Sequence, residues 1–306
     1  MLWEETFGAQ LEKFLRKEQF IFHAPMSAHT TFKIGGEADV LIFPSNAEEV
    51  SKIFKLIDMF SLPCTILGNG SNVLVRDKGI RGVVVKFTEE FFGGMKCEGQ
   101  RLTACAGAKL KDVAIFAAEN GLTGLEFACG IPGSIGGAIF MNAGAYGGEM
   151  KNVIASVKAV TQGGDFIEFS GAGLDLHYRH SIFQENGCAI CEVELILQRG
   201  NIDEIKNTMA DFTERRESKQ PLDMPSAGST FKRPKGHFAG TLIDKAGLKG
   251  LKIGGAMVSE KHAGFVVNTG GATAQDVLTL IEEVKRRVYE THGVTLSPEV
   301  RIIGEE

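Results

Sequence analysis

The chain has 306 residues, of which 43% are hydrophobic and 23% are charged, and its formal net charge is −5. This is the composition of an ordinary globular protein, without the basic excess that nucleic-acid-binding proteins carry. Residues 1–20 carry charges throughout, which excludes the apolar core of a signal peptide, and no apolar run of about 18 residues follows. We therefore expect a cytoplasmic protein with neither a nucleic acid nor a membrane as partner.

The cysteines also fit the cytoplasm, because six in a chain of this length are too sparse for a disulfide scaffold. Cys188 and Cys191 form a C-x-x-C pair, a spacing that occurs in zinc and redox sites. The surrounding run, CAICEVELIL, predicts a strand, in which residues three apart point to opposite faces. We therefore expect no metal at this pair, and none elsewhere.

The first third of the chain predicts helices and strands in alternation. A helical spacing of apolar residues in 11–18 predicts the first helix. Asn46 and Glu49 form a capping box, and an apolar face on residues 50–57 predicts the helix that follows it. Three runs predict strands: CTILG, NVLVR and GVVVKF. A polar stretch around Gly93 then indicates a domain boundary.

The rest of the chain continues in the same way. Residues 109–120 predict a helix closed by Gly121, after which a glycine-rich segment begins. Asn201 and Thr273 each carry the capping signal of a further helix. The remaining strands are predicted by the runs VIASVKAV, DFIEF, CAICEVELIL and HAGFVVN, and the closing run VTLSPEVRIIG is predicted to be extended.

The segment from Gly124 to Gly148 is the most informative part of the sequence. It contains eight glycines and, after Glu126, no charged residue. Glycine lets other groups approach the backbone closely, so such a segment suits main-chain N–H groups that surround an anion. The alternative is a buried turn between two strands. A second glycine-polar cluster, Gly68–Asn72, favours the anion site, although neither a Rossmann fingerprint nor a P-loop is present.

Taken together, the motifs resemble one family over essentially the whole chain. The loops GNGSN and GIPGSIGGAIFMNAGAYG resemble the flavin-contacting loops of the FAD-binding fold shared with vanillyl-alcohol oxidase. The runs KIGG, GNGSNVLV, YRHSIF, GSTFKRP, LIDKAGLKG and LSPEVRIIG occur in the order found in the UDP-N-acetylenolpyruvoylglucosamine reductase family. The chain is similar to the shorter, type II members, since it lacks the extra segment and the Tyr loop of type I members.

The resemblance implies an α+β protein with a two-lobed FAD-binding fold of the vanillyl-alcohol oxidase (PCMH) type and a smaller α/β substrate-binding domain. We expect the first lobe in residues 1–90, the second lobe in 91–212 and the substrate-binding domain in 213–306. The C-terminal run is expected to return to the active site.

The resemblance also implies an activity. Members of the family reduce UDP-N-acetylglucosamine enolpyruvate to UDP-N-acetylmuramate with FAD that NADPH has reduced, in bacterial peptidoglycan synthesis. That pathway serves cell-wall biogenesis, cell shape, the cell cycle and cell division. We expect a monomer with non-covalent FAD, in which NADPH and the sugar nucleotide use one cleft in turn.

Three residues match the family's catalytic positions. The resemblance implies that Arg179 holds the enolpyruvyl carboxylate, that Ser229 donates the proton to the α-carbon, and that Glu299 shares the negative charge. Taken alone, each residue has a plainer interpretation: a surface ion pair for Arg179, a turn serine for Ser229, and an exposed carboxylate for Glu299.

A second set matches positions that bind the sugar nucleotide: Tyr178, Arg215, Lys219 and Lys232. A charged run such as 214–219 is most often a solvated helix end. The implied role is contact with the UDP phosphates. His180 and Arg233 depart from residues found in other members, so their roles stay open.

The glycine loops supply the residues expected to bind FAD. This set comprises Gly35, Leu67, Gly68, Asn69, Gly70, Ser71, Asn72, Gly130, Pro132, Gly133, Ser134, Gly136, Gly137, Ala138, Asn142 and Ala143.

Two other functions compete with the reductase. A flavin oxidase of the same fold would pass its electrons to oxygen, and a nucleotide-sugar-binding module would have no turnover. The phosphate-binding cations together with Ser229 and Glu299 disfavour the oxidase, and the flavin loops disfavour the binding module.

Overall fold

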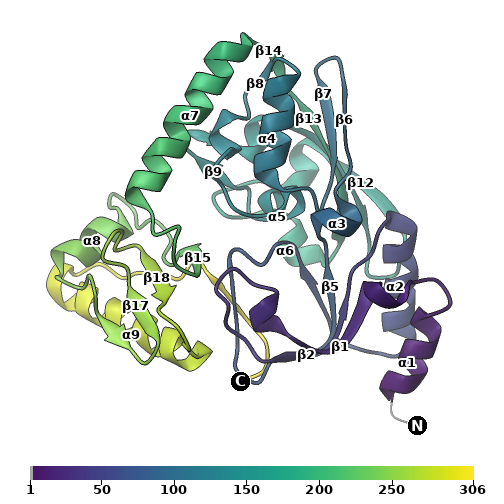
Figure 1. Ribbon diagram of the computed structural model, residues 1–306, viewed down its shortest axis with the longest axis horizontal. Helices are drawn as coiled ribbons and strands as arrows, with labels where there is room; N and C mark the ends of the chain where they lie inside the picture. Colours follow the sequence, from purple (N-terminus) through teal and green to yellow (C-terminus); the bar gives the residue numbers. More distant parts are fainter. Residues whose placement is uncertain (1–2) are drawn as a thin grey trace. The chain divides into compact units, whose positions relative to one another are not determined.

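The computed structural model describes residues 3–306 and divides them into two compact units, which Figure 1 shows as ribbons. Each unit is assembled from separate stretches of the chain. The first unit contains the residues up to Phe22, Val40–Asn69 and Gly82–Arg215, and the second contains His23–Asp39, Gly70–Arg81 and Arg216–Glu306. Both units mix helices with largely antiparallel sheets, so the expected α+β class is confirmed.

Two larger sheets and two short ribbons lie wholly or for the most part in the first unit. One sheet has the order β1-β2-β5-β3, with β1 Phe20–Pro25, β2 Glu37–Ile42, β5 Ile80–Lys86 and β3 Cys64–Leu67. The other has the order β12-β11-β13-β7-β6, with β12 Phe166–Ser170, β11 Ile154–Val160, β13 Ala189–Ile196, β7 Arg101–Cys105 and β6 Met95–Glu98. The ribbons pair β9 Gly144–Ala145 with β10 Gly148–Glu149, and β8 Leu122–Thr123 with β14 Gln198–Arg199.

Helices connect these strands. They are α1 Trp3–Leu11, α2 Ala47–Met59, α3 Glu89–Phe92, α4 Leu110–Glu119, α5 Ile135–Phe140, α6 Phe183–Asn186 and α7 Ile202–Lys219. Short 3₁₀ turns complete the unit: η1 Lys17–Gln19, η3 Glu126–Ala128, η4 Met150–Asn152 and η5 Gly171–Leu174. Helix α5, which forms within the glycine-rich segment, packs on β7 and β13. The five-stranded sheet therefore supports that segment from below.

Local sequence signals explain several of these elements. The Asn46 side chain accepts the Glu49 N–H at 2.8 Å, so the predicted cap of α2 is confirmed. The strand predicted around the C-x-x-C pair is also confirmed as β13, with Cys188 just before it. Burial raises the pKa of the Cys191 thiol to about 12, so this sulfur stays protonated at physiological pH.

The second unit is a small α+β domain with a two-stranded extension. Its four-stranded sheet has the order β15-β18-β17-β16, with β15 Ser226–Ser229, β18 Phe265–Asn268, β17 Ala256–Val258 and β16 Lys252–Ile253. Its other elements are η2 Met26–Ala28, α8 Ala239–Lys245, α9 Ala274–His292 and the parallel pair β4 Val73–Val75 and β19 Arg301–Ile303. Helix α9 packs on β16 and β17 (Figure 1) and α8 packs on α9.

Each unit has a hydrophobic core of its own. The core of the first unit includes Val83, Leu102, Ile135 and Val193, and that of the second includes Leu74, Ile243 and Val277. Because burial of apolar surface is the main favourable term in folding, each unit holds its loops on a packed base.

The ends of α9 show how closely local sequence and structure agree. Thr273 and Asp276 form the predicted capping box, in which the Thr273 hydroxyl accepts the Asp276 N–H at 3.0 Å. The Asp77 carboxylate accepts two more N–H groups of the first turn, from Ala274 at 2.8 Å and Gln275 at 3.0 Å. Gly293 closes the helix with a φ of 67°.

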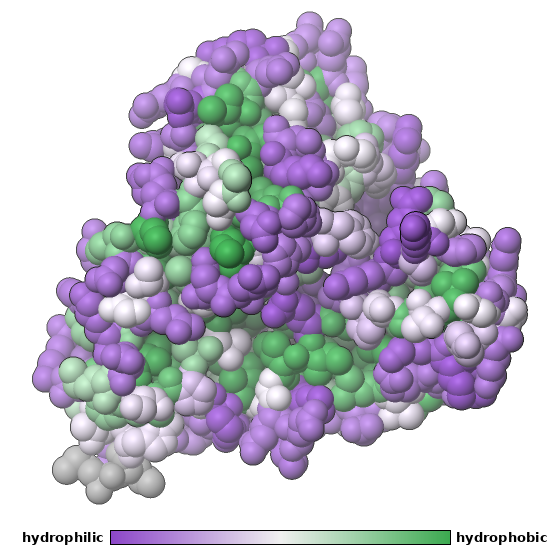
Figure 2. Space-filling view, turned by 180° about the vertical axis from the view of Figure 1, so that it is seen from behind, coloured by the Kyte–Doolittle hydropathy of each residue, from purple (hydrophilic) through white to green (hydrophobic). Residues whose placement is uncertain are grey.

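Figure 2 shows hydrophilic residues over much of one face, with smaller hydrophobic groups between them. Within residues 3–306, no helix is both long and apolar enough to span a bilayer.

The Thr273→Ala variant tests the cap of α9. Loss of one capping hydroxyl leaves the Asp276 N–H without its partner, so the free energy of unfolding should fall by about 1 kcal/mol. The matched control is Thr279→Ala, an exposed threonine of the same helix whose hydroxyl donates to the Gln275 carbonyl and accepts from Gln275 Nε2, and which caps no N–H group of the first turn. Urea unfolding of both variants measures the difference. Equal stability of the two variants would contradict the role of the cap.

Candidate active site

The two glycine loops of the first unit meet at Gly68 and Ser134. Gly68 directly follows β3, and Ser134 is the N-cap of α5, with its hydroxyl accepting the Gly137 N–H. A Cβ added to Gly68 would lie 2.6 Å from the Ser134 Oγ, closer than real Cβ atoms come to other groups. The Gly68 main chain therefore lies directly against the Ser134 hydroxyl, and the nearest main-chain atoms of α5 are the N and Cα of Gly137, each 3.8 Å from the added Cβ. Glycine at position 68 permits this approach of the two loops, which a pyrophosphate cradle would need.

Other residues of the predicted FAD set make contacts within the protein itself. The Gly136 N–H donates to the Ala106 carbonyl at 3.0 Å, and a Cβ on Gly136 would lie 2.9 Å from the Ala106 Cβ. The N–H groups of Ala138 and Ala143 also donate to backbone carbonyls of the same segment, at 2.9 and 2.8 Å. Glycine at position 136 is thus explained by the packing of α5 against β7.

The loop before α5 carries the remaining predicted residues of this segment. Gly130, Pro132 and Gly133 lie between η3 and α5, and Gly133 has a φ of 131° that disfavours other residues. The Gly133 carbonyl accepts the Leu110 N–H at 3.0 Å, which fixes the loop to the start of α4. Leu67 is buried at the end of β3, while Asn69 is exposed.

The other half of the GNGSN loop belongs to the second unit, with Gly35. A Cβ on Gly35 would lie 2.6 Å from the Val75 Cβ, and one on Gly70 would lie 2.7 Å from the His29 carbonyl oxygen. Both glycines have positive φ, at 135° and 67°. Ser71 and Asn72 follow directly, and Asn72 is tied to the C-terminal run because its carbonyl accepts the Arg301 N–H at 3.0 Å.

The second unit also brings Ser229, Lys232 and Glu299 onto one pair of adjacent segments. The Glu299 N–H donates to the Thr230 carbonyl at 2.8 Å, and the Lys232 N–H donates to the Ser297 carbonyl at 2.8 Å. Asn72 Nδ2 donates to the Glu299 carbonyl at 3.3 Å. The predicted proton donor, the predicted charge-sharing carboxylate and the GNGSN loop are thus connected by main-chain contacts within one unit.

In the first unit, Tyr178 and Arg179 occupy a two-residue turn. His177 and His180 flank the turn, and each donates its N–H to the carbonyl of the other at 3.2 Å. Arg179 has a φ of 57°, and its guanidinium carbon lies 5.2 Å from the centroid of the Tyr178 ring. A cation above a ring face is an attractive contact that orients the side chain.

Three side chains fasten this turn to the glycine-rich segment. Asn142 Nδ2 donates to the His177 carbonyl at 2.9 Å, and Gln184 Nε2 donates to the Arg179 carbonyl at 3.0 Å. Gln184 Nε2 and the Ser181 hydroxyl both donate to the Phe140 carbonyl, each at 2.8 Å. The turn of Arg179 is therefore held against the C-terminal end of α5.

Both the nitrogen and the oxygen of the Asn142 side chain form hydrogen bonds within the protein. It is buried, and besides His177 its amide donates to Glu149 Oε2 at 2.9 Å and accepts the Lys151 N–H at 3.0 Å. Its predicted contact with FAD stays a prediction, and the structure adds a second task, the support of the turn.

The charged residues of α7 are divided between the units. Arg215 forms a two-point ion pair with Asp211, with N–O distances of 2.8 Å for both contacts. A phosphate bound by Arg215 would therefore share the guanidinium with Asp211. Lys219 is exposed at the end of α7 and Lys232 is exposed after Phe231, and both positions suit contact with a charged ligand.

Sequence reasoning missed the residues that support the turn. Ser181 and Gln184 belong to the run YRHSIFQ, so the motif itself was a signal for them. Asp175 gave no signal, although its carboxylate contacts both histidines that flank the turn, His177 at 2.9 Å and His180 at 3.0 Å.

Comparisons with known proteins identify the family of the chain. A family model described as an FAD binding domain matches residues 38–170, and a model for the C-terminal domain of UDP-N-acetylenolpyruvoylglucosamine reductase matches residues 220–303. The reductase of that name from Clostridium perfringens is 52% identical over 300 residues, which cover 98% of each chain. The one from Clostridium botulinum is 51% identical over 302 residues, or 99% of this chain and 98% of the relative.

Solved structures give the same result. The structure of UDP-N-acetylenolpyruvylglucosamine reductase from Thermus caldophilus has a TM-score of 0.79 and 36% identity, covering 93% of this chain and 98% of its own. A p-cresol methylhydroxylase structure, 12% identical with a TM-score of 0.51, shares the fold and covers 98% of this chain and 67% of its own. The expected fold type is thus confirmed. The chain belongs to the UDP-N-acetylenolpyruvoylglucosamine reductase family of FAD-containing oxidoreductases.

Proposed function

We propose that this protein reduces UDP-N-acetylglucosamine enolpyruvate to UDP-N-acetylmuramate, with NADPH as the electron donor and non-covalent FAD as the cofactor. The observation that carries the proposal is the attachment of the Arg179 turn to the glycine-rich segment through Asn142 and Gln184. This attachment supports the proposal because it ties the turn of Arg179, the cation expected to bind the substrate carboxylate, to the segment expected to hold FAD.

The residues present fit FAD. Glycine at position 68 lets the GNGSN loop lie directly against the Ser134 hydroxyl at the start of α5, so the two glycine loops meet with no room for a further side chain. No formal charge lies between Glu126 and Glu149, so the pyrophosphate would be held by the backbone and by hydroxyl or amide groups. When bound, FAD supplies the hydride that adds to the β-carbon of the enol ether.

The residues of the chain would manage the charge and the proton. Addition at the β-carbon leaves negative charge on the α-carbon and its carboxylate, and the guanidinium of Arg179 can hold that carboxylate at two points. Glu299 would share that charge together with Arg179. The Ser229 hydroxyl would then donate a proton to the α-carbon, while Lys232 and Lys219 stabilise the alkoxide that remains.

The same cations would hold the nucleotide. Lys219 and Lys232 are point charges suited to phosphate, and Arg215 adds a forked donor. Tyr178 would cover the substrate beside Arg179. We further propose the three-part division at residues 1–90, 91–212 and 213–306. The match of the reductase C-terminal model to residues 220–303 supports the last part, and the FAD-binding model at residues 38–170 spans the first two.

The enzyme is proposed to act in the bacterial cytoplasm as a monomer, in peptidoglycan synthesis and thus in cell-wall biogenesis, cell shape and division. The near-complete coverage of relatives that carry the reductase name supports this assignment.

Anaerobic spectroscopy tests the activity. NADPH added to the purified protein should bleach the flavin absorption band at about 450 nm. Addition of the enolpyruvyl substrate should then restore the band. Recovery only on admission of oxygen would indicate an oxidase, and the absence of any bleaching would indicate a binding module. Either result would contradict the reductase assignment.

Ser229→Ala tests the proton donor. Protonation follows substrate binding, so NADPH should reduce the variant at nearly the normal rate. Reoxidation by the enolpyruvyl substrate should slow by a factor on the order of 10². Ser226→Ala is the matched control, because Ser226 lies in the same strand. Its backbone carbonyl accepts a hydrogen bond from the Thr31 hydroxyl, and the substitution preserves that carbonyl. Stopped-flow spectroscopy resolves the two steps, and unimpaired reoxidation would show that Ser229 is structural.

Gly68→Ala tests the cofactor cradle. The added methyl would meet the Ser134 Oγ, so the protein should purify with less than one FAD per chain. Ser134→Ala in the same chain should restore part of the FAD, because it removes the clashing oxygen. Gly163→Ala, whose Cβ would have no neighbour closer than 3.7 Å, is the control. A full complement of FAD in Gly68→Ala would place the cofactor elsewhere.

A further inference from the structure

The turn that carries Arg179 is strained. Arg179 has a φ of 57°, in the left-handed region that a non-glycine residue adopts only at a cost in free energy. Backbone strain of this kind persists only where surrounding contacts hold it in place. The side chains of Asn142 and Gln184 donate hydrogen bonds to the carbonyls of His177 and Arg179. These bonds hold the backbone of the turn and do not involve the imidazole rings.

Asp175 holds those rings. Its Oδ1 lies 2.9 Å from His177 Nε2, and its Oδ2 lies 3.0 Å from His180 Nε2. The two rings are stacked, with centroids 6.1 Å apart and an angle of 20° between their planes. One carboxylate thus bridges the residues immediately before and after Tyr178 and Arg179. We call Asp175, His177 and His180 the imidazole clamp.

The direction of these hydrogen bonds follows from the charge of Asp175. The hydrogen bond from His180 and the neighbouring imidazoles hold the pKa of the Asp175 carboxyl below its usual range. The carboxylate is then ionised at neutral pH and can only accept hydrogen bonds. Each imidazole therefore carries hydrogen on Nε2, and both rings are oriented by the same acceptor.

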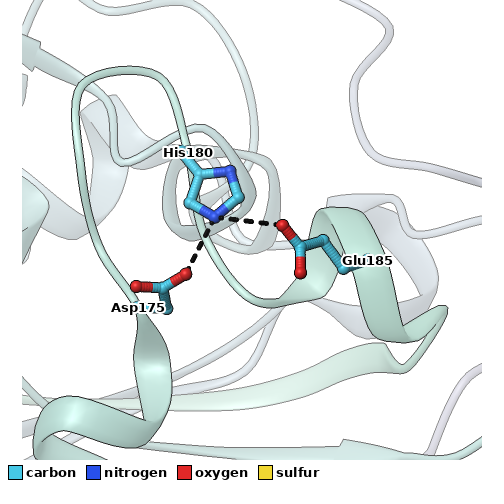
Figure 3. A group of neighbouring side chains, drawn as sticks. All are labelled: Asp175, His180 and Glu185. Atoms are coloured by element: carbon cyan, nitrogen blue, oxygen red, sulfur yellow. Dashed lines mark hydrogen bonds and ion pairs between the residues drawn. The ribbon is translucent and has the colours of Figure 1, made fainter.

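Charged residues on neighbouring segments also lie near the clamp. Figure 3 shows His180 between Asp175 and Glu185, whose Oε1 lies 3.6 Å from His180 Nε2. A hollow of about 520 Å³ adjoins the clamp and is lined in part by Asp175, His177 and Lys151. Lys151 forms an ion pair with Glu149 at 2.7 Å. Glu185 approaches the clamp at longer range than Asp175, so Asp175 is the principal acceptor.

We propose that Asp175 is a positioning residue, which acts through His177 and His180 to hold the strained turn that presents Arg179 to the enolpyruvyl carboxylate. This inference rests on the proposed function, since it assigns Asp175 a role through Arg179. Asp175 itself contacts neither substrate nor cofactor in this account. The clamp fixes the direction of the Arg179 side chain, while Asn142 and Gln184 fix the backbone beneath it.

The test compares Asp175→Ala, Arg179→Ala and the double variant with wild type. Stopped-flow spectroscopy measures reoxidation of the NADPH-reduced protein by the enolpyruvyl substrate, and FAD content and melting temperature report on the fold. Asp175→Ala should bind FAD normally, melt within a few degrees of wild type, and reoxidise on the order of tenfold more slowly, because a displaced contact weakens a positioned group. Asp58→Ala, an exposed aspartate at the end of α2, is the matched control.

The double variant distinguishes positioning from general loss of structure. If Asp175 acts through Arg179, Asp175→Ala should slow the Arg179→Ala protein no further, since the group that it positions is already gone. A full additional tenfold loss in the double variant would overturn the inference. Normal reoxidation in Asp175→Ala together with slow reoxidation in Arg179→Ala would also overturn the inference. That result would leave the proposed function intact. Normal reoxidation in Arg179→Ala would instead overturn the proposed role of Arg179 and this inference with it.

A chelator resolves one further possibility. The ligand atoms of Asp175, His180 and Glu185 lie within 4.8 Å of one another, a spacing that a divalent cation could also use. The positioning role predicts the same wild-type rate with and without the chelator. A rate that falls on chelation would identify a metal site and overturn the hydrogen-bonded clamp.

Discussion

The close approach of the Gly68 main chain to the Ser134 hydroxyl is the constraint on which the candidate site depends. A side chain at position 68 would collide with the Ser134 hydroxyl, which caps the helix formed by the glycine-rich segment. That helix rests on β7 and β13, and Gly136 is required where it meets Ala106. The loops proposed to hold FAD are therefore fixed by the packed sheet below them rather than by side chains that reach for the ligand.

The proposed catalytic residues are positioned by this packed base and by its counterpart in the second unit. The turn of Arg179 is hydrogen-bonded to Phe140 and Asn142, so any shift of α5 would move the guanidinium as well. In the second unit, the pairing of β19 with β4 returns the C-terminal run to the GNGSN loop and sets Glu299 next to Thr230. In the first unit, Arg179 lies two residues after His177, whose carbonyl accepts from Asn142 of the glycine-rich segment. In the second unit, the carbonyl of Glu299 itself accepts from Asn72 of the GNGSN loop.

The sequence predicts those features whose causes are local. The caps at Asn46 and Thr273 involve residues three apart, and both are confirmed. The family motifs likewise predicted the fold type, and the comparisons confirm it. The sequence does not predict the bond from Asn142 to His177, because no periodic pattern marks a contact between residues so far apart. The same holds for Asp77, which binds the first turn of α9, and for Asp175, whose neighbours are defined only once the turn has formed.

Hydrogen–deuterium exchange with and without FAD tests the central claim most directly, namely that one packed segment supports both the cofactor loops and the Arg179 turn. The account predicts that FAD slows exchange in residues 130–143 and, through the bonds from Asn142 and Gln184, in residues 177–180 as well, while α9 is unchanged. Slower exchange in the glycine-rich segment with no change at the turn would contradict that coupling.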